Sequence, residues 1–340
     1  MKVLNAVTNF DDLSQIVHAL EAIYESNSSN ETRKDATIYL ERAKTQPEAP
    51  ERGFALAVDT AQLPVVRYYG LSLLEYPIRY RWEDYSSEQT LAVRRWIIQL
   101  AQGVREEDPL FLRNKIAQLW VEVAIRAWVG EWLDMDELLY DLWQRSWSHQ
   151  EVVLHVLETL ADQIFSKEDP AAGIRGAELG RACVEIFISA RELTDTFPTR
   201  EASLGMRYGE EGWLQRLSTT LSSCLNNNIE DLQHVRMVAV KVIVVIRSVM
   251  PWIMLKAVSH THWIELLGKA LAVPDVNVQM ACPSFSERST TSDTYRLLWK
   301  HSMLYTTAHN MEMTMSWTLF VRSFLLKEWS SCEARTTHTT

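Results

Sequence analysis

The stretch from residue 67 to residue 143 constrains the fold most, because four apolar stripes follow one another in it at helical spacing. Two of these stripes are Val93, Trp96, Ile97, Leu100 and Val104, and then Leu112, Ile116, Leu119, Trp120, Val123 and Ala127. Apolar residues at 3.6-residue intervals predict amphipathic helices, each with one face that a neighbour must cover. Antiparallel pairing of successive helices covers these faces with short connections.

Short polar joints separate the four predicted helices. Ser86 stands three residues before Gln89, the spacing of a capping box. Asp108 precedes Pro109, which predicts an N-cap followed by proline at the first helical position. Pro77 lies inside a predicted helix and predicts a kink, because proline removes one helical hydrogen bond.

The same pattern extends along most of the chain. Further helices are predicted at residues 10–24, 30–44, 48–59, 148–165 and 174–192, and a loop at 205–212. Helix pairs that start near Phe10, Glu48, Ser87, Asp134 and Ala171 recur at roughly 38, 39, 47 and 37 residues, as in HEAT-type arrays. We therefore predict an all-α fold, an α-solenoid of HEAT-like antiparallel helix pairs.

Composition agrees with this class. The chain has 340 residues, of which 47% are hydrophobic, and only 11 glycines, so a large helical core is expected. Cys183, Cys224, Cys282 and Cys332 are widely spaced, which favours a reducing compartment and buried free thiols. The most apolar segment contains Lys241, Arg247 and Pro251, so no membrane helix is expected.

Motifs for catalysis, cofactors and metals are absent from the sequence, and none of these sites is predicted. Gly173, Gly176 and Gly180 lie in a helical pattern, where close helix contact is favoured over phosphate binding. His260 and His262 are two residues apart, a spacing that favours a solvated turn over a metal site.

One acidic cluster leaves two interpretations open. Asp134, Asp136, Glu137 and Asp141 lie at and after a predicted helix start. Acids there complement the helix macrodipole, which is the favoured interpretation. The alternative is a magnesium site of an all-helical enzyme.

The net charge of −10 favours some classes of binding partner over others. A protein that grips nucleic acid along its main surface normally has an excess of basic residues. An acidic array of helices instead suits a basic protein partner, through complementary potentials.

Two segments resemble a known family. The string YYGLSLLE at 68–75, followed by Ile78, Arg81 and Trp82, resembles the second helical hairpin of nuclear export receptors of the importin-β (karyopherin) superfamily. The string LRNKIAQLWVEVAIRAWVGEW at 112–132 resembles the third hairpin, which ends in a Trp-Pro-x-x-Trp turn. Trp128 and Trp132 match that turn, whereas Val129 stands where the family has proline.

The resemblance is to the exportin-five group, and it implies that the chain is the N-terminal part of a longer receptor. Residues 1–283 are then expected to form the HEAT-type solenoid. Residues 284–340 are expected to be a divergent tail, either one further helix pair or foreign sequence; one amphipathic piece in the tail contains Trp317, Phe320, Phe324 and Leu325.

The partners that the resemblance implies are Ran-GTP, export cargo and nucleoporins, with shuttling between nucleus and cytoplasm and no chemistry by the chain itself. The cargo class stays open between phosphoprotein and structured RNA. The helices at 65–82 and 109–128 are expected to face Ran. The candidate Ran-facing residues are Arg67, Tyr68, Arg79, Arg113, Gln118 and Glu122.

Two other classes of function remain as alternatives. A helical-repeat scaffold for protein partners, without Ran dependence, shares the stripes and the period but not the family strings. An all-helical magnesium-dependent enzyme requires its carboxylates to converge on a cavity.

Overall fold

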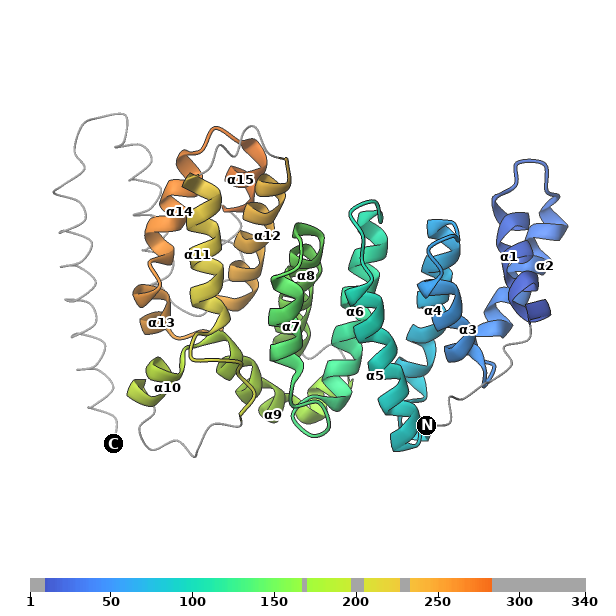
Figure 1. The fold of residues 1–340 in the computed structure, drawn as a ribbon, viewed down its shortest axis with the longest axis horizontal. Coiled ribbons are helices and arrows are strands. Elements are labelled where there is room, and N and C mark those ends of the chain that lie inside the picture. The colour runs from blue at the N-terminus through green and yellow to red at the C-terminus, as the bar shows by residue number, and fades with distance from the viewer. Residues whose placement is uncertain (1–9, 167–169, 197–204, 227–232, 283–340) are drawn as a thin grey trace. The chain divides into compact units, whose positions relative to one another are not determined.

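The computed structural model describes residues 10–166, 170–196, 205–226 and 233–282 (Figure 1). These residues form fifteen α-helices and one 3₁₀-helix, without a β-strand among them, which confirms the all-α class. The chain divides into two compact units, Met1–Thr261 and His262–Thr340. The predicted tail, with Trp317 and Cys332, lies outside the described residues, and the predicted boundary at residue 283 stays a prediction.

The helices of each unit begin and end where polar or proline-containing joints interrupt the apolar stripes. In the first unit they are α1 (Phe10–Tyr24), α2 (Asn30–Lys44), α3 (Ala49–Val58), α4 (Pro64–Tyr80), η1 (Trp82–Asp84), α5 (Ser87–Gln102), α6 (Leu110–Ala127), α7 (Met135–Trp143), α8 (Trp147–Ser166), α9 (Pro170–Phe187), α10 (Ala190–Thr196), α11 (Trp213–Asn226), α12 (Gln233–Val249) and α13 (Leu255–His260). The second unit contains α14 (Trp263–Ala272) and α15 (Val276–Ala281). The starts of α1, α3, α5, α7 and α9 lie within one residue of the predicted pair starts.

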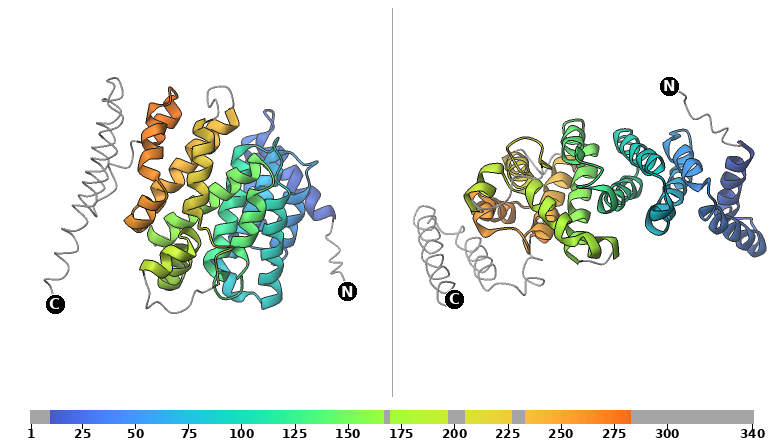
Figure 2. Two further views of the ribbon diagram at one scale, coloured as in Figure 1. Left: turned by 60° about the vertical axis from the view of Figure 1, so that its left-hand side comes forward. Right: turned by 90° about the horizontal axis from the view of Figure 1, so that it is seen from below.

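Successive helices of the first unit pair as α1 with α2, α3 with α4, α5 with α6, α7 with α8 and α11 with α12. The second helices of these pairs pack one against the next, in the order α2, α4, α6, α8 and α12. Figures 1 and 2 show these pairs side by side in chain order. Each pair covers the apolar stripe of its neighbour, and this confirms the HEAT-type array.

The array is irregular at α9 and α10, where the sequence predicted one helix over 174–192. The structure ends α9 at Phe187, and α9 packs on α6, α8 and α11. The loop before α11 passes directly against this helix end, where a Cβ on Gly212 would overlap the Phe187 carbonyl group. The Ala190 amide donates to the Glu210 carbonyl at 3.1 Å, so the chain turns here and does not extend α9.

Helices α3 and α4 approach most closely at two glycines, Gly53 and Gly70. A Cβ on either residue would lie 2.7 Å from the carbonyl oxygen of the other. The helical pattern of the sequence predicted close helix contact instead at the glycines of α9, Gly173, Gly176 and Gly180. That prediction is wrong for Gly173, because no atom lies within 4 Å of its Cβ position.

Of the two predicted helix caps, the one at Ser86 forms and the one at Asp108 does not. Ser86 and Gln89 form the predicted capping box at the start of α5. Helix α6 starts at Leu110 after Pro109, so the predicted capping role of Asp108 is wrong. The Asp108 carboxylate instead accepts from Arg67 Nη1 at 2.5 Å and from the Arg105 amide at 2.9 Å. Helix α4 continues past Pro77 to Tyr80.

The turn after α6 places Trp128 and Trp132 fully inside the core. Val129, at the position where the resembling family has proline, has a φ of 75°. Proline cannot adopt that angle, so this chain makes the turn differently. Arg175 of α9 donates to the carbonyl oxygens of Ile125 at 2.8 Å and Trp128 at 2.5 Å, which holds the end of α6.

The three cysteines in the described ranges are buried free thiols, as expected. Burial raises the pKa of Cys224 to about 11 and that of Cys282 to about 12. Burial raises the pKa of Cys183 further. No helix in the described part of the chain is both long enough and apolar enough to cross a membrane.

Candidate functional site

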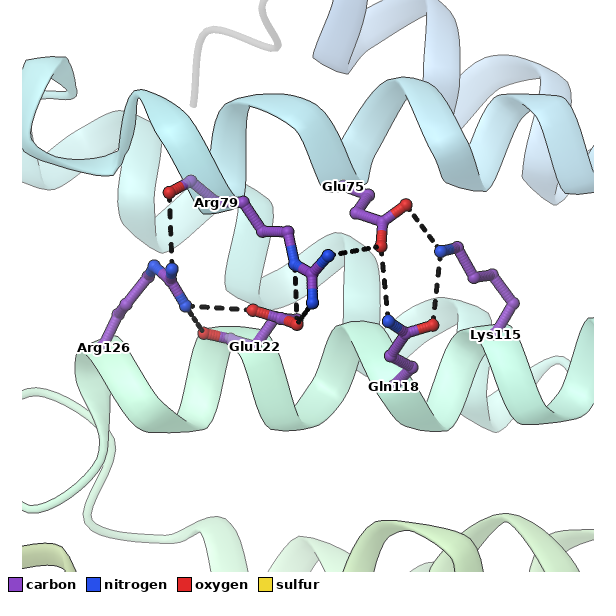
Figure 3. Close-up of polar contacts among 6 residues, drawn as sticks. All are labelled: Glu75, Arg79, Lys115, Gln118, Glu122 and Arg126. Atoms are coloured by element: carbon purple, nitrogen blue, oxygen red, sulfur yellow. Dashed lines mark hydrogen bonds and ion pairs between the residues drawn. The ribbon is translucent and has the colours of Figure 1, made fainter. Parts of the chain in front are cut away.

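The candidate site is the face on which α4 and α6 run side by side, which we call the α4–α6 face (Figure 3). Residues three or four apart point to the same side of a helix, so each helix contributes one stripe of mostly polar side chains to this face. The α4–α6 face consists of Tyr68, Ser72, Glu75 and Arg79 on α4, and Leu110, Phe111, Lys115, Gln118, Glu122 and Arg126 on α6. Contacts such as Arg79 with Glu122 and Glu75 with Gln118 join residues 43 positions apart, so the two helices run in the same direction.

Glu75 is the centre of one half of the polar network. Its carboxylate accepts from Lys115 Nζ at 2.6 Å and from Gln118 Nε2 at 3.3 Å. Arg79 Nη1 lies 3.6 Å from the same carboxylate, one turn along α4. Glu75 therefore joins its own helix to two side chains of α6 (Figure 3).

Glu122 is the centre of the other half, and its side chain is fully buried. One carboxylate oxygen accepts from Arg79 Nε at 2.9 Å and lies 2.8 Å from Arg79 Nη2. The other accepts from Arg126 Nη1 at 3.1 Å. Burial lowers the pKa of Arg79, but the hydrogen bond to Glu122 and the negative charges of Glu122 and Glu75 together outweigh burial, so this pKa lies above its usual value.

The α4–α6 face has an aromatic end beside this network. Tyr68 and Phe111 pack edge to face with ring centroids 5.7 Å apart. Lys115 Nζ lies 5.9 Å from the Tyr68 ring centre, which joins the aromatic end to the charged network. Tyr68, Leu110 and Phe111 remain 37%, 41% and 48% exposed, so these apolar groups are available to a partner.

The structure separates the six predicted Ran-facing residues into two groups. Tyr68, Arg79 and Gln118 reach the surface of the α4–α6 face. Arg67, Arg113 and Glu122 are buried. That any of the six contacts Ran stays a prediction.

Two of the buried residues join neighbouring elements of the array. Arg67 donates to the Ala57 carbonyl at 3.1 Å and pairs with Asp108. Arg113 lies 2.8 Å from Glu151 of α8, and its guanidinium lies 5.2 Å from the Trp147 ring centre. In this structure both side chains therefore hold helices together.

Three residues that complete the α4–α6 face were not among the predicted site residues, namely Phe111, Lys115 and Arg126. The available signal was their spacing, because Phe111, Lys115, Gln118, Glu122 and Arg126 recur every three or four residues along α6. That stripe is polar at one end and aromatic at the other, and it lies about 100° around the helix from the apolar stripe used for prediction.

In the acidic cluster of α7, Asp134 and Asp136 lie at the helix start, as predicted, but Asp136 has a further role. Asp136 is fully buried and accepts from Trp213 Nε1 at 2.5 Å and from the Tyr208 amide at 2.7 Å. Burial raises the pKa of Asp136 despite these donors. Asp136 therefore anchors the loop 205–212 and the start of α11 to α7, a role that macrodipole arguments do not predict.

Within the described ranges, no group of three or more His, Cys, Asp or Glu side chains has the geometry to hold a metal ion. His260 is the last residue of α13, and its side chain is exposed and lies 2.8 Å from Glu192. His262 is exposed and lies in a turn with a φ of 57°, so the predicted solvated turn is confirmed at His262.

Comparison with known proteins identifies similar chains. Residues 36–103 match the model of the importin-beta N-terminal domain. The chain is 29% identical over 229 residues to Protein MSN5 of Saccharomyces cerevisiae, which covers 63% of this chain and 19% of that protein. It is 27% identical over 156 residues to Exportin-5 of Homo sapiens, which covers 45% of this chain and 13% of that protein.

A third relative, Exportin-T of Homo sapiens, is 24% identical over 110 residues, covering 31% of this chain and 11% of that protein. The chain thus spans less than a fifth of the length of these relatives. The domain match contains all of α4 and α5 and ends before α6.

Proposed function

Because the chain belongs to the importin-β (karyopherin) superfamily as an exportin-five-like member, we propose that it is the N-terminal part of a nuclear export receptor. In this proposal the α4–α6 face binds Ran in its GTP form. The receptor carries a phosphoprotein or structured-RNA cargo, contacts nucleoporins, and shuttles between nucleus and cytoplasm. The chain performs no chemistry itself.

One observation carries the proposal: the matched domain contains α4, and the exposed stripe of α4 is completed by α6. The α4–α6 face combines exposed aromatic side chains with a fixed charged network. Aromatic residues and arginine are the side chains most enriched at protein interfaces and their hot spots. These properties fit recognition of a folded protein.

The array also offers a physical basis for coupling Ran to cargo. Most contacts of a helix pair are with the pairs packed beside it, so a ligand that changes the spacing of one pair affects the next. If Ran-GTP and cargo favour the same spacing, each raises the affinity of the other by the same factor. In the proposed export cycle, Ran-GTP and cargo bind together, and both are released when Ran hydrolyses GTP.

The test is a titration of the chain with Ran loaded with GTP or with GDP, measured by calorimetry. We expect binding to the GTP form only. The double variant Tyr68→Ala with Phe111→Ala is expected to weaken binding by at least about tenfold, because two exposed aromatic contacts are removed. Tyr24→Ala removes an exposed aromatic side chain from α1 and serves as the matched control.

Equal affinity for both nucleotide forms, or none for either, contradicts the proposal. Those results favour a helical-repeat scaffold without Ran dependence. Loss of binding in the Tyr24→Ala control to the same degree as in the double variant contradicts the assignment of the α4–α6 face.

A further inference from the structure

The polar network of the α4–α6 face contains three cations and two carboxylates in alternation, namely Lys115, Glu75, Arg79, Glu122 and Arg126. The network therefore has one excess positive charge, in a chain whose net charge is −10. Among the cations, Arg79 is 35% exposed, whereas Lys115 and Arg126 are each 8% exposed. The excess charge is accessible to a partner mainly at Arg79.

Glu122 cannot touch a partner directly, because its side chain is fully buried. One of its oxygens holds the Nε edge of Arg79, and Arg126 holds the other (Figure 3). Arg126 also donates to the Glu122 carbonyl at 2.9 Å, so the carboxylate is fixed from two sides. Glu122 can therefore affect binding only through the side chain that it holds.

The remaining edge of Arg79 is held more weakly. Its Nη1 lies 3.6 Å from Glu75, an ion-pair distance longer than a hydrogen bond. A guanidinium that is already fixed along one edge presents its other donors at a defined position, and its fork matches a carboxylate or phosphate. Fixing a side chain before association lowers the entropic cost of binding.

We propose that Glu122 is a positioning residue that holds Arg79 ready to receive an acidic side chain of the partner protein. Tyr68 and Phe111 receive an apolar side chain of the same partner, about three helical turns away along the α4–α6 face. This inference rests on the proposed function and names the chemistry of the Ran segment that docks on the α4–α6 face. It also assigns different roles to Arg79 and Glu122, of which only Arg79 touches the partner.

The test is a double-mutant cycle on binding of Ran-GTP. Arg79→Gln and Glu122→Gln are each expected to weaken binding by about tenfold, the scale of one charge-assisted hydrogen bond. The double variant is expected to bind no more weakly than Arg79→Gln alone, because Glu122 acts through Arg79. Arg95→Gln on α5 removes an exposed arginine outside the α4–α6 face and is the matched control.

Salt dependence gives a second readout that a purely structural role does not change. The wild-type affinity is expected to fall with added salt more steeply than that of Arg79→Gln, because screening weakens the acidic contact. Circular dichroism checks folding of each variant. If Glu122→Gln does not fold, Arg126→Gln takes its place in the cycle, because Arg126 fixes the other carboxylate oxygen.

The outcomes separate the two proposals. If the wild type shows no nucleotide-dependent binding, the proposed function fails and this inference fails with it. If the wild type binds Ran-GTP but Arg79→Gln binds equally well, only the inference fails. Additive losses in the cycle overturn the positioning role of Glu122, and a salt dependence in Arg79→Gln equal to that of the wild type overturns the acidic contact at Arg79.

Discussion

The contact between Gly53 and Gly70 predicts that Gly70→Ala destabilises the protein, although alanine is the better helix former. A Cβ on Gly70 would lie 2.7 Å from the Gly53 carbonyl oxygen, 2.8 Å from the Ala57 amide nitrogen and 2.9 Å from the Leu56 Cβ. Two of these three atoms belong to the backbone of α3, so no side-chain rotation relieves the overlap. Helix α3 must move away from α4.

The magnitude follows from the distances. Helix α3 must retreat by about 0.7 Å to restore ordinary contact, and a gap of that size loses roughly a quarter to a half of the dispersion energy along the interface. Overpacking of this kind costs about 1–3 kcal/mol. Because backbone atoms are involved, we take the upper end of this range for Gly70→Ala. Alanine also has the higher helix propensity, which offsets about 1 kcal/mol of that cost. The expected net loss is about 2 kcal/mol.

Urea unfolding followed by circular dichroism measures this loss. Gly173→Ala in α9 is the matched control, because no atom lies within 4 Å of its Cβ position and it gains helix propensity alone. We expect the control to be about 0.5–1 kcal/mol more stable than the wild type. A Gly70→Ala protein as stable as the control refutes the steric reasoning. Since α4 carries Tyr68 and Arg79, Gly70→Ala is also expected to weaken Ran-GTP binding.

Three further substitutions test single features of the fold. Val129→Gly is expected to raise the free energy of unfolding by about 1 kcal/mol, since a β-branched residue is strained at a φ of 75°; a lower urea midpoint contradicts this. Asp108→Asn is expected to cost about 3 kcal/mol at neutral pH, because it leaves Arg67 buried without its carboxylate. Burial raises the pKa of Asp108, but hydrogen bonds from Arg67 and Arg105 hold it below its usual value, so the wild type loses this stability as the pH falls through the folded pKa. The difference between variant and wild type should therefore shrink in acid, and a difference that is constant with pH argues against the ion pair. Trp213→Phe removes the indole donor from buried Asp136 and is expected to cost about 1–3 kcal/mol, and an unchanged melting temperature refutes that role.

The helices were predictable because their signal is local. The observed bounds of α1 and α2 equal the predicted ones, and the capping box at Ser86 was recognised from four residues. Apolar spacing and caps act over one or two turns, so the sequence contains the whole signal. The break after Phe187 was missed because it depends on a loop more than twenty residues later in the chain.

The site was predictable only in part because its chemistry is non-local. Periodicity placed Arg79 and Glu122 on helices expected to lie together, but it could not show that Glu122 is buried between two arginines. Asp136 shows the same limit more strongly. Its donors lie more than seventy residues away, so a first-turn acid could not be distinguished from an anchor.

Ion pairs between neighbouring helix pairs explain how an array of similar helices can favour one arrangement over others. Apolar stripes alone are interchangeable, because any amphipathic helix can cover another. The ion pairs Arg67 with Asp108, Arg79 with Glu122, and Arg113 with Glu151 each join one helix pair to the next. Buried ion pairs add little net stability, but a register that separates them leaves an uncompensated buried charge. Ion pairs of this kind therefore disfavour other registers of neighbouring pairs, and on the α4–α6 face the same contacts fix Arg79, the side chain that we propose meets the partner.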